Sequence, residues 1–345
     1  MESRFQCFPG LMKKDKKQRY FLENGGTLLE ELVSSCKGRW RCNPIRTYSA
    51  KEIEEATDHF ESFIKADGFS KWYKGTLEDR PVLIKKYNEN GAYRDIACRD
   101  IAVGSQMSSH KNVLKLLGCC LEFPQPALVY EYVEPGHLNS TGVIDSTGLS
   151  LSWKMRLKVA KDIANAITYL HTSFDRPIVH RDIKPSNILL DKDFNPKLCD
   201  FSLSITIPEG KTHVEDRVCG TWGYLDPDYA NTSLITEHTD VYSFGIMLCV
   251  FLTGRKVFEF YRPENEGSLL EYITELTEIE RWMEVVDPKI LEGDIGEEQQ
   301  LQLEAFLELA LKCTQRTRED RPLMIDVAKE LVRIEKSVSC PSRLA

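Results

Sequence analysis

The most constraining feature of the chain lies near its middle, where residues 180–187 read HRDIKPSN and residues 200–202 read DFS. Phosphoryl transfer requires an acid that orients the attacking hydroxyl, a cation on the moving phosphoryl group and oxygen ligands for magnesium. Residues of these types occur here in the required order: Asp182, Lys184, Asn187 and Asp200. Each match alone is weak, but together they favour a phosphoryl-transfer fold.

Composition restricts the classes of function. The 345 residues carry a net charge of −8, which gives no support for nucleic-acid binding. Eleven cysteines, without a C-x-x-C pair, predict neither a disulfide framework nor a zinc site and fit a reducing compartment. No apolar run approaches the roughly 20 residues that a membrane helix needs, so we expect a cytoplasmic protein without a transmembrane segment.

A basic run near the N-terminus has two readings. Its residues are Lys13, Lys14, Lys16, Lys17 and Arg19. They could contact anionic lipid and hold the protein peripherally at the plasma membrane. The alternative, which we favour, is a solvated tail.

Spacing and turn signals divide the chain into elements. Residues 1–26 are expected to be a mobile leader, followed by a short helix that Gly38 stops. Ser49 and Glu52 form a predicted capping box at the start of the next helix. Strands are expected at 72–77, 81–85, 113–121 and 127–133, and helices at 93–107, 240–253, 268–277, 301–313 and 323–337.

Strands followed by helices are typical of an α+β chain. We expect a small, β-rich N-lobe with one main helix and a larger, helical C-lobe. The expected limits are 1–48 for a partly disordered leader with its short helix, 49–133 for an extension and the N-lobe, 134–337 for the C-lobe and 338–345 for a tail.

Further segments carry a family resemblance. They are VLIK at 82–85, LVYEY at 128–132, GTWGYLDP at 220–227, DVYSFG at 240–245 and DRP at 320–322. Positions 60–335 resemble a plant receptor-like kinase domain, which implies the bilobal protein-kinase fold. The upstream NGGTLL and ATDHF resemble wall-associated kinases. Together these features are similar to the resistance-related kinases, largely pseudokinase-like cytoplasmic proteins that act as adaptors for a nucleotide-binding leucine-rich-repeat (NLR) immune receptor.

The resemblance implies a role for each motif residue. Asp182 would accept the hydrogen bond of the substrate hydroxyl, and Lys184 would steady the γ-phosphoryl group. Asn187 and Asp200 would hold magnesium. The implied nucleotide-binding positions are Lys85, Asp100, Asp67, Ser70, Leu83, Glu131 and Val133.

Within that set, Lys85 would pair with the α- and β-phosphates, and Asp100 stands where the supporting acid is usually Glu. Tyr130 occupies the gatekeeper position, and the segment from Glu131 to Val133 should form the adenine hinge.

Other charged residues are implied as scaffold. Asp240 and Arg321 should be buried or partly buried with partners, and Asp228 replaces the usual Glu partner of Arg321. Arg181 could receive a phosphorylated residue of the activation segment, the stretch that follows Asp200. The threonines singled out there are Thr206, Thr212 and Thr221, which would otherwise be ordinary surface residues.

The glycine-rich loop departs from the family pattern. A working loop reads G-x-G-x-x-G-x-V because backbone amides must approach the phosphates. Here Lys65, Asp67 and Ser70 replace the glycines, and Trp72 replaces Val. A carboxylate at Asp67 beside triphosphate would cost roughly 1 kcal/mol at water's dielectric and about 4 near a protein surface, at 4 Å.

Two other substitutions add to this damage. Leu83 would crowd the adenine roof, and Ser202 removes the backbone freedom of the usual Gly. Lys65 could offset part of the loss if it reaches the phosphates.

Two functions remain open. The lost glycines and the resemblance favour an adaptor in plant immune signalling, with an NLR receptor and other receptor-like cytoplasmic kinases or pathogen effectors as partners. The intact catalytic loop favours a weak or atypical serine/threonine kinase that binds ATP and Mg²⁺ weakly. We prefer the adaptor, because phosphoryl transfer depends on positioning and phosphate electrostatics. A substrate decoy for a pathogen enzyme is compatible with it.

Overall fold

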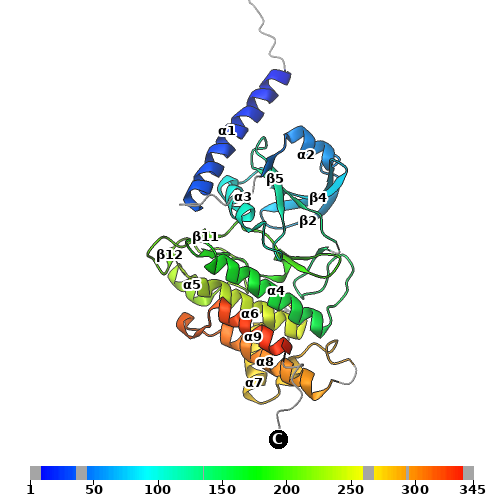
Figure 1. The fold of residues 1–345 in the computed structure, drawn as a ribbon, viewed down its shortest axis with the longest axis vertical. Coiled ribbons are helices and arrows are strands. Elements are labelled where there is room, and N and C mark those ends of the chain that lie inside the picture. Colours follow the sequence, from blue (N-terminus) through cyan, green and yellow to red (C-terminus); the bar gives the residue numbers. More distant parts are fainter. Residues whose placement is uncertain (1–8, 36–44, 135, 259–267, 293–294, 337–345) are drawn as a thin grey trace, which may run out of the picture. The chain divides into compact units, whose positions relative to one another are not determined.

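The computed structural model describes residues 9–35, 45–134, 136–258, 268–292 and 295–336 (Figure 1). The chain divides into two compact units. Unit 1 comprises Met1–Ser109 and Leu114–Tyr132, and unit 2 comprises His110–Val113 and Val133–Ala345. Unit 1 holds the main sheet and unit 2 most of the helices, which confirms the predicted α+β class.

Unit 1 is built on a six-stranded sheet with the order β1-β5-β6-β4-β3-β2. Only β1 and β5 pair in parallel; the other neighbours are antiparallel. The elements are α1 (Pro9–Ser35), β1 (Arg46–Thr47), α2 (Ala50–Ala56), β2 (Phe63–Ala66), β3 (Ser70–Leu77), β4 (Arg80–Tyr87), α3 (Arg94–Met107), β5 (Leu116–Cys120) and β6 (Ala127–Glu131).

Local signals explain two of these elements. The predicted capping box is present, because the Ser49 side chain accepts from the Glu52 amide and the Glu52 carboxylate accepts from the Ser49 amide. Glu78 and Asp79 both have positive φ, which closes β3 and β4 with the two-residue turn that suits the twist of a hairpin.

The N-terminal helix differs from the expectation. α1 begins at Pro9 and continues through the glycine pair, so residues 9–26 are not a mobile leader; Gly38, the expected stop, lies outside the described residues. The Asn24 amide donates to the carbonyls of Leu121 and Phe123 at 2.8 and 2.9 Å, and its oxygen accepts from Arg94 at 2.8 Å. These tertiary contacts outweigh the low helix propensity of glycine.

Unit 2 is mainly helical. Its helices are α4 (Trp153–Thr172), α5 (Pro227–Thr232), α6 (Glu237–Thr253), α7 (Leu269–Glu278), α8 (Glu297–Cys313) and α9 (Met324–Lys336), with short turns η1 (Pro185–Asn187), η2 (Trp282–Val285) and η3 (Arg318–Asp320). Its short strands are β7 (Gly136–His137), β8 (Ile178–Val179), β9 (Ile188–Leu190), β10 (Pro196–Leu198), β11 (Ile205–Thr206), β12 (Val214–Glu215) and β13 (Leu234–Ile235).

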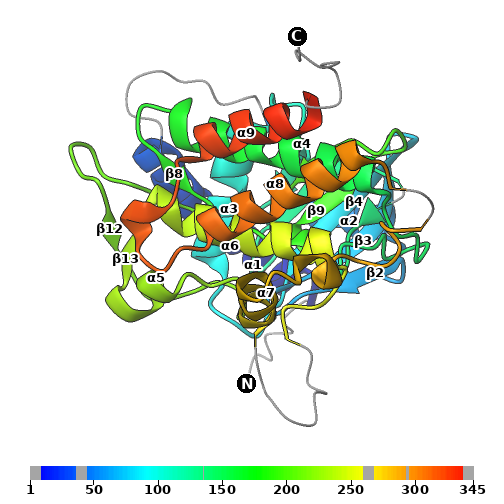
Figure 2. The same ribbon diagram turned by 90° about the horizontal axis from the view of Figure 1, so that it is seen from below.

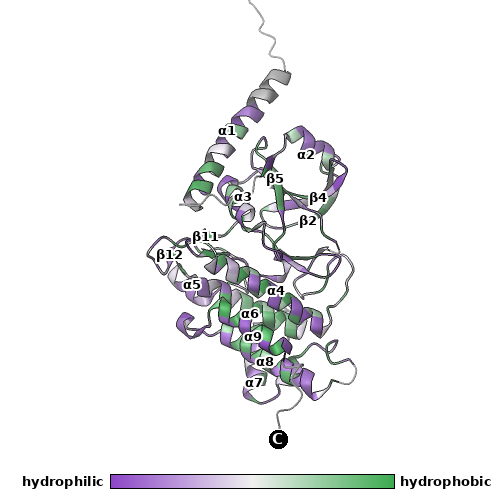
Figure 3. Ribbon diagram, viewed as in Figure 1, coloured by the Kyte–Doolittle hydropathy of each residue, from purple (hydrophilic) through white to green (hydrophobic). Residues whose placement is uncertain are grey.

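Helix α6 forms the core of unit 2. It packs against α4, α8 and α9, which Figure 2 shows running alongside one another. Every residue from Thr239 to Thr253 is buried, and the helix is largely hydrophobic in Figure 3, which is the composition expected of a helix enclosed on all sides. Within the described part of the chain, no helix is both long and apolar enough for a membrane crossing.

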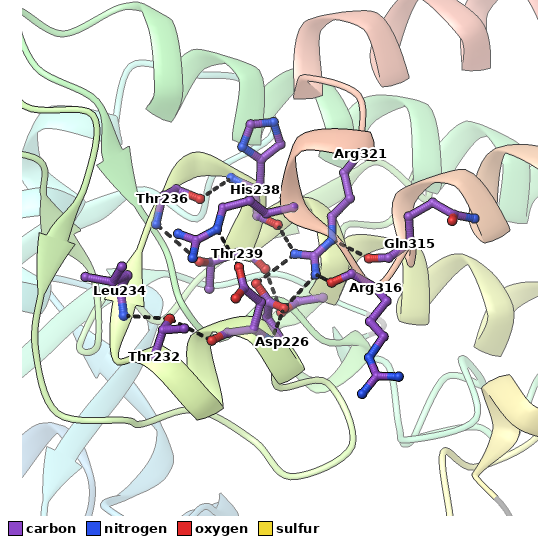
Figure 4. Close-up of polar contacts among 12 residues, drawn as sticks. Asp226, Thr232, Leu234, Thr236, His238, Thr239, Gln315, Arg316 and Arg321 are labelled. Atoms are coloured by element: carbon purple, nitrogen blue, oxygen red, sulfur yellow. Dashed lines mark hydrogen bonds and ion pairs between the residues drawn. The ribbon is translucent and has the colours of Figure 1, made fainter.

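The guanidinium of Arg321 is a buried charge of unit 2 with several hydrogen-bond partners (Figure 4). It makes two hydrogen bonds to the Asp226 carboxylate, at 2.7 and 2.8 Å. Its remaining N–H groups donate to the carbonyls of Gln315, His238 and Arg316. All five of its donors therefore have acceptors.

The expected partner of Arg321 was wrong. Asp228 pairs instead with Arg318. Asp226 is the N-cap residue of α5 and Asp228 lies in its first turn, and the two carboxylates pair with different arginines. The chain thus keeps the arginine–acid pair but takes the acid two residues earlier.

The variant Asp226→Ala, which removes this carboxylate, should therefore strongly destabilise the protein. Arg321 and Asp226 side chains are 0 and 3% exposed, and breaking a buried pair costs roughly 3–5 kcal/mol. The matched control is Asp228→Ala, whose pair with Arg318 is 23 and 18% exposed and should cost about 0–1 kcal/mol. Urea unfolding of both variants measures the difference. If both variants lose the same free energy of unfolding, the Arg321–Asp226 pair stabilises the protein no more than the exposed pair does.

Candidate functional site

Strand β4 and helix α3 bring Lys85 and Asp100 together. The ammonium lies 2.9 Å from the carboxylate, and the side chains are 1 and 0% exposed. The same carboxylate accepts hydrogen bonds from the Tyr87 and Tyr130 hydroxyls, at 2.9 and 3.3 Å. Asp100 is thus the partner of Lys85 that the sequence predicted, although the two tyrosines were not foreseen in this contact.

The strand residues around Lys85 lie on one face of the sheet. Side chains two residues apart on a strand share a face, so Leu83, Lys85 and Tyr87 point the same way. Trp72 lies opposite Lys85 on β3, and Tyr130 lies opposite Leu83 on β6. Period-two alternation after Lys85 is therefore a signal that would have identified Tyr87.

Aromatic rings close over the lysine. Trp72 and Tyr130 stack with ring centroids 5.5 Å apart and an interplanar angle of 22°. The Lys85 ammonium lies 5.7 Å from the Trp72 centroid and 4.8 Å from that of Tyr87, within cation–π range. Trp72, where the family pattern has Val, fills this face with an indole ring.

The loop between β2 and β3 is closed by its own carboxylate. One oxygen of Asp67 accepts from the backbone amides of Phe69 and Ser70, at 2.8 and 2.6 Å. The other accepts from the Ser70 hydroxyl at 2.6 Å. The sequence suggested a carboxylate facing a phosphate, whereas the carboxylate turns inward and occupies amides of the kind that bind phosphates.

Lys65 and Glu131, also in unit 1, contact other groups of the protein. The Lys65 ammonium lies over the Trp72 ring, 5.5 Å from its centroid. At the end of β6, the Glu131 amide donates to the Lys115 carbonyl at 3.0 Å, and its carboxylate accepts from the Lys115 amide at 3.1 Å. Val133 is the first residue of the long segment of unit 2 and is buried.

In unit 2 the catalytic-loop residues converge. The Asp182 carboxylate lies 2.6 Å from the Lys184 ammonium and accepts from the Asn187 amide at 3.0 Å. The Thr221 hydroxyl donates to Asp182 and accepts from Lys184, both at 2.6 Å. Thr221 was foreseen only as a candidate phosphorylation site or ordinary surface residue, yet it bridges the acid and the cation.

A buried acid on α6 holds this loop. The Asp240 carboxylate accepts from the backbone amides of His180 and Arg181, both at 2.8 Å, and lies 2.8 Å from the His171 ring. Burial alone would raise the pKa of Asp240, but the hydrogen bond and charge of His171 and the bonds from the loop lower it. Asp240 and Arg321 are thus both buried with partners, as expected.

The metal motif carries an added hydroxyl. Asp200 has a positive φ of 68°, and its carboxylate accepts from the Ser202 hydroxyl at 2.6 Å. The serine that replaces the usual glycine therefore competes for an oxygen that would bind magnesium.

The fit of these groups to Mg-ATP differs between the two units. In unit 1 the loop amides are occupied by Asp67, and Lys85 is buried among aromatic rings. In unit 2 one oxygen of Asp200 is already engaged. The residue types on Asp182, Lys184 and Asn187 suit phosphoryl transfer, but the phosphate-binding groups of unit 1 do not fit a triphosphate in this arrangement.

The fold and site define a protein kinase domain, and a family model with that description matches residues 68–332. Among curated relatives from Arabidopsis thaliana, the serine/threonine-protein kinase ZRK1 is 45% identical over 336 residues, 94% of this chain and 95% of its own. The non-functional pseudokinase ZED1 is 48% identical over 331 residues, 93% of this chain and 98% of its own. The chain belongs to this plant family of ZRK and ZED1 kinases and pseudokinases, which confirms the resemblance.

Wall-associated receptor kinase 4, from the same plant, is 37% identical over 338 residues, 94% of this chain and 44% of its own length. The similarity to wall-associated kinases drawn from the upstream motifs is thereby confirmed.

Replacing Asp67 should improve nucleotide binding. Asp67→Gly frees the amides of Phe69 and Ser70 and removes one negative charge, so Mg-ATP should bind about 10- to 1000-fold tighter, with less gain in high salt. Isothermal titration calorimetry measures the change. Asp79→Gly, which removes the same charge from the other hairpin turn, is the matched control. If both variants bind alike, the obstacle lies in the packing of Trp72 and Tyr130 instead.

Proposed function

We propose that this chain is a kinase-fold adaptor in plant immune signalling, with little or no phosphoryl transfer. It would link an NLR receptor to the recognition of pathogen effectors, with other receptor-like cytoplasmic kinases as further partners. The observation that carries the proposal is the loop closed by Asp67, since phosphoryl transfer depends on backbone amides that position the phosphates.

Two further observations support it. Lys85 is neutralised and enclosed within unit 1, so the cation that would orient a nucleotide already has a partner. The relatives that cover nearly the whole chain include proteins named as pseudokinases. The proposed location is the cytoplasm, with the N-terminal basic run as a means of peripheral membrane contact.

A second candidate is a weak serine/threonine kinase. The set of Asp182, Lys184, Asn187 and Thr221 supports it, because these side chains contact one another and three of them are of the types that phosphoryl transfer requires. Titration of the wild-type protein with Mg-ATP separates the candidates. A clear micromolar heat signal would favour the enzyme, and its absence would favour the adaptor.

The adaptor proposal predicts that the catalytic acid is dispensable. Asp182→Asn keeps the shape of the side chain and its acceptor for Thr221 but removes the charge. Receptor binding, measured by co-purification from plant tissue, and downstream signalling should stay near the wild-type level. Circular dichroism on the same preparation checks that the variant is folded. Loss of signalling by a folded Asp182→Asn protein would contradict the proposal.

A further inference from the structure

The guanidinium of Arg181 lies at the centre of a polar cluster in unit 2. One Nη donates to the Asp216 carboxylate at 2.8 Å. The other donates to the Arg217 carbonyl at 2.8 Å and lies 2.6 Å from both the Cys219 sulfur and the Tyr229 hydroxyl. Arg181 is buried, so its charge needs an anion nearby.

The backbone around Asp216 is tied down by a second set of contacts. The Tyr229 hydroxyl donates to the Arg217 carbonyl at 2.7 Å and accepts from the Cys219 amide at 3.0 Å. The Asp216 amide donates to the Ser233 carbonyl at 3.2 Å, beside the pairing of β12 with β13. Tyr229 is fully buried, which makes it a fixed anchor.

We propose that Asp216 is a built-in anion for Arg181, so that residues 214–219 hold their conformation without phosphorylation. The arginine of this loop is suited to receive a phosphorylated residue. Here a carboxylate of the chain itself already occupies Nη1, and the neighbouring donors are used by Arg217, Cys219 and Tyr229. A phosphate that bound these Nη groups would have to displace their partners, and the one donor atom without a partner among the described residues, Nε, is buried.

The contact of Asp216 with Arg181 also affects the surface of the activation segment. Val218 lies within residues 214–219 and Trp222 follows them. Both side chains are exposed, Trp222 by 77%. On this proposal, exposure of their apolar surface does not require phosphorylation of the segment. Asp216 would act in this way in an adaptor and in an enzyme alike, because its contact with Arg181 affects only the order of this segment.

Hydrogen–deuterium exchange of the full-length chain tests the proposal. Wild-type protein treated with a phosphatase, and shown by mass spectrometry to carry no phosphate, should keep peptide 214–219 as protected as untreated protein. Asp216→Asn should speed exchange there by about 10- to 100-fold, since the acceptor loses the charge that neutralises the buried Arg181 guanidinium and the hydrogen bond weakens. Glu215→Gln is the matched control: it removes the same charge from an exposed neighbour on β12 and should leave exchange unchanged.

Two results would overturn the proposal, and one further variant should support it. Faster exchange in the phosphatase-treated wild type would overturn the proposal without any variant, so the test survives if Asp216→Asn does not fold. Equal exchange in Asp216→Asn and Glu215→Gln would overturn it as well. Asp216→Glu, which keeps a carboxylate, should restore much of the protection.

Discussion

Asp240 places one negative charge at the centre of unit 2, where none of its surface is exposed. Its oxygens accept the backbone amides of His180 and Arg181, and the ring of His171 lies against it. An unpaired charge in this position would be strongly unfavourable, so the loop has little freedom to move away. The convergence of Asp182 with its neighbours, and the direction of the Arg181 side chain, both depend on this one anchored stretch of backbone.

Unit 1 meets a related constraint with different means. A buried ammonium must be neutralised, and Lys85 is neutralised by Asp100. The tyrosine hydroxyls occupy further lone pairs of that carboxylate, while the indole and phenol rings supply favourable quadrupoles around the cation. A charge that a nucleotide would otherwise satisfy is thus satisfied within unit 1, by side chains of the sheet and of α3.

The motifs predicted the fold well because their chemistry requires particular residue types at particular spacings. They also identified Asp100, which follows from the position of Lys85 on a strand before a helix. The direction of the Asp67 carboxylate was not predictable, since in a short loop an aspartate can face solvent or bind its own backbone. The acid that pairs with Arg321 was misplaced by two residues, because spacing alone does not tell which side of α5 a carboxylate takes.

The C-terminal part of α1 matches the predicted short helix, but its N-terminal part, residues 9–26, was missed, and the reason lies outside local sequence. Its glycine pair argued against a continuous helix, but Asn24 and Leu28 are buried against the rest of unit 1. Such contacts join residues about a hundred positions apart, and no short window of sequence contains both partners.

Helix α1 lies ahead of the residues that the kinase family model matches, yet it belongs to unit 1. The family model begins at residue 68, yet the carbonyls of Leu121 and Phe123 are satisfied by an asparagine 44 positions upstream of it. Without that side chain, two acceptors within the unit would need new partners. The segment ahead of the recognised domain is therefore part of the architecture of unit 1, and recombination at the domain boundary would separate two halves of one folding unit.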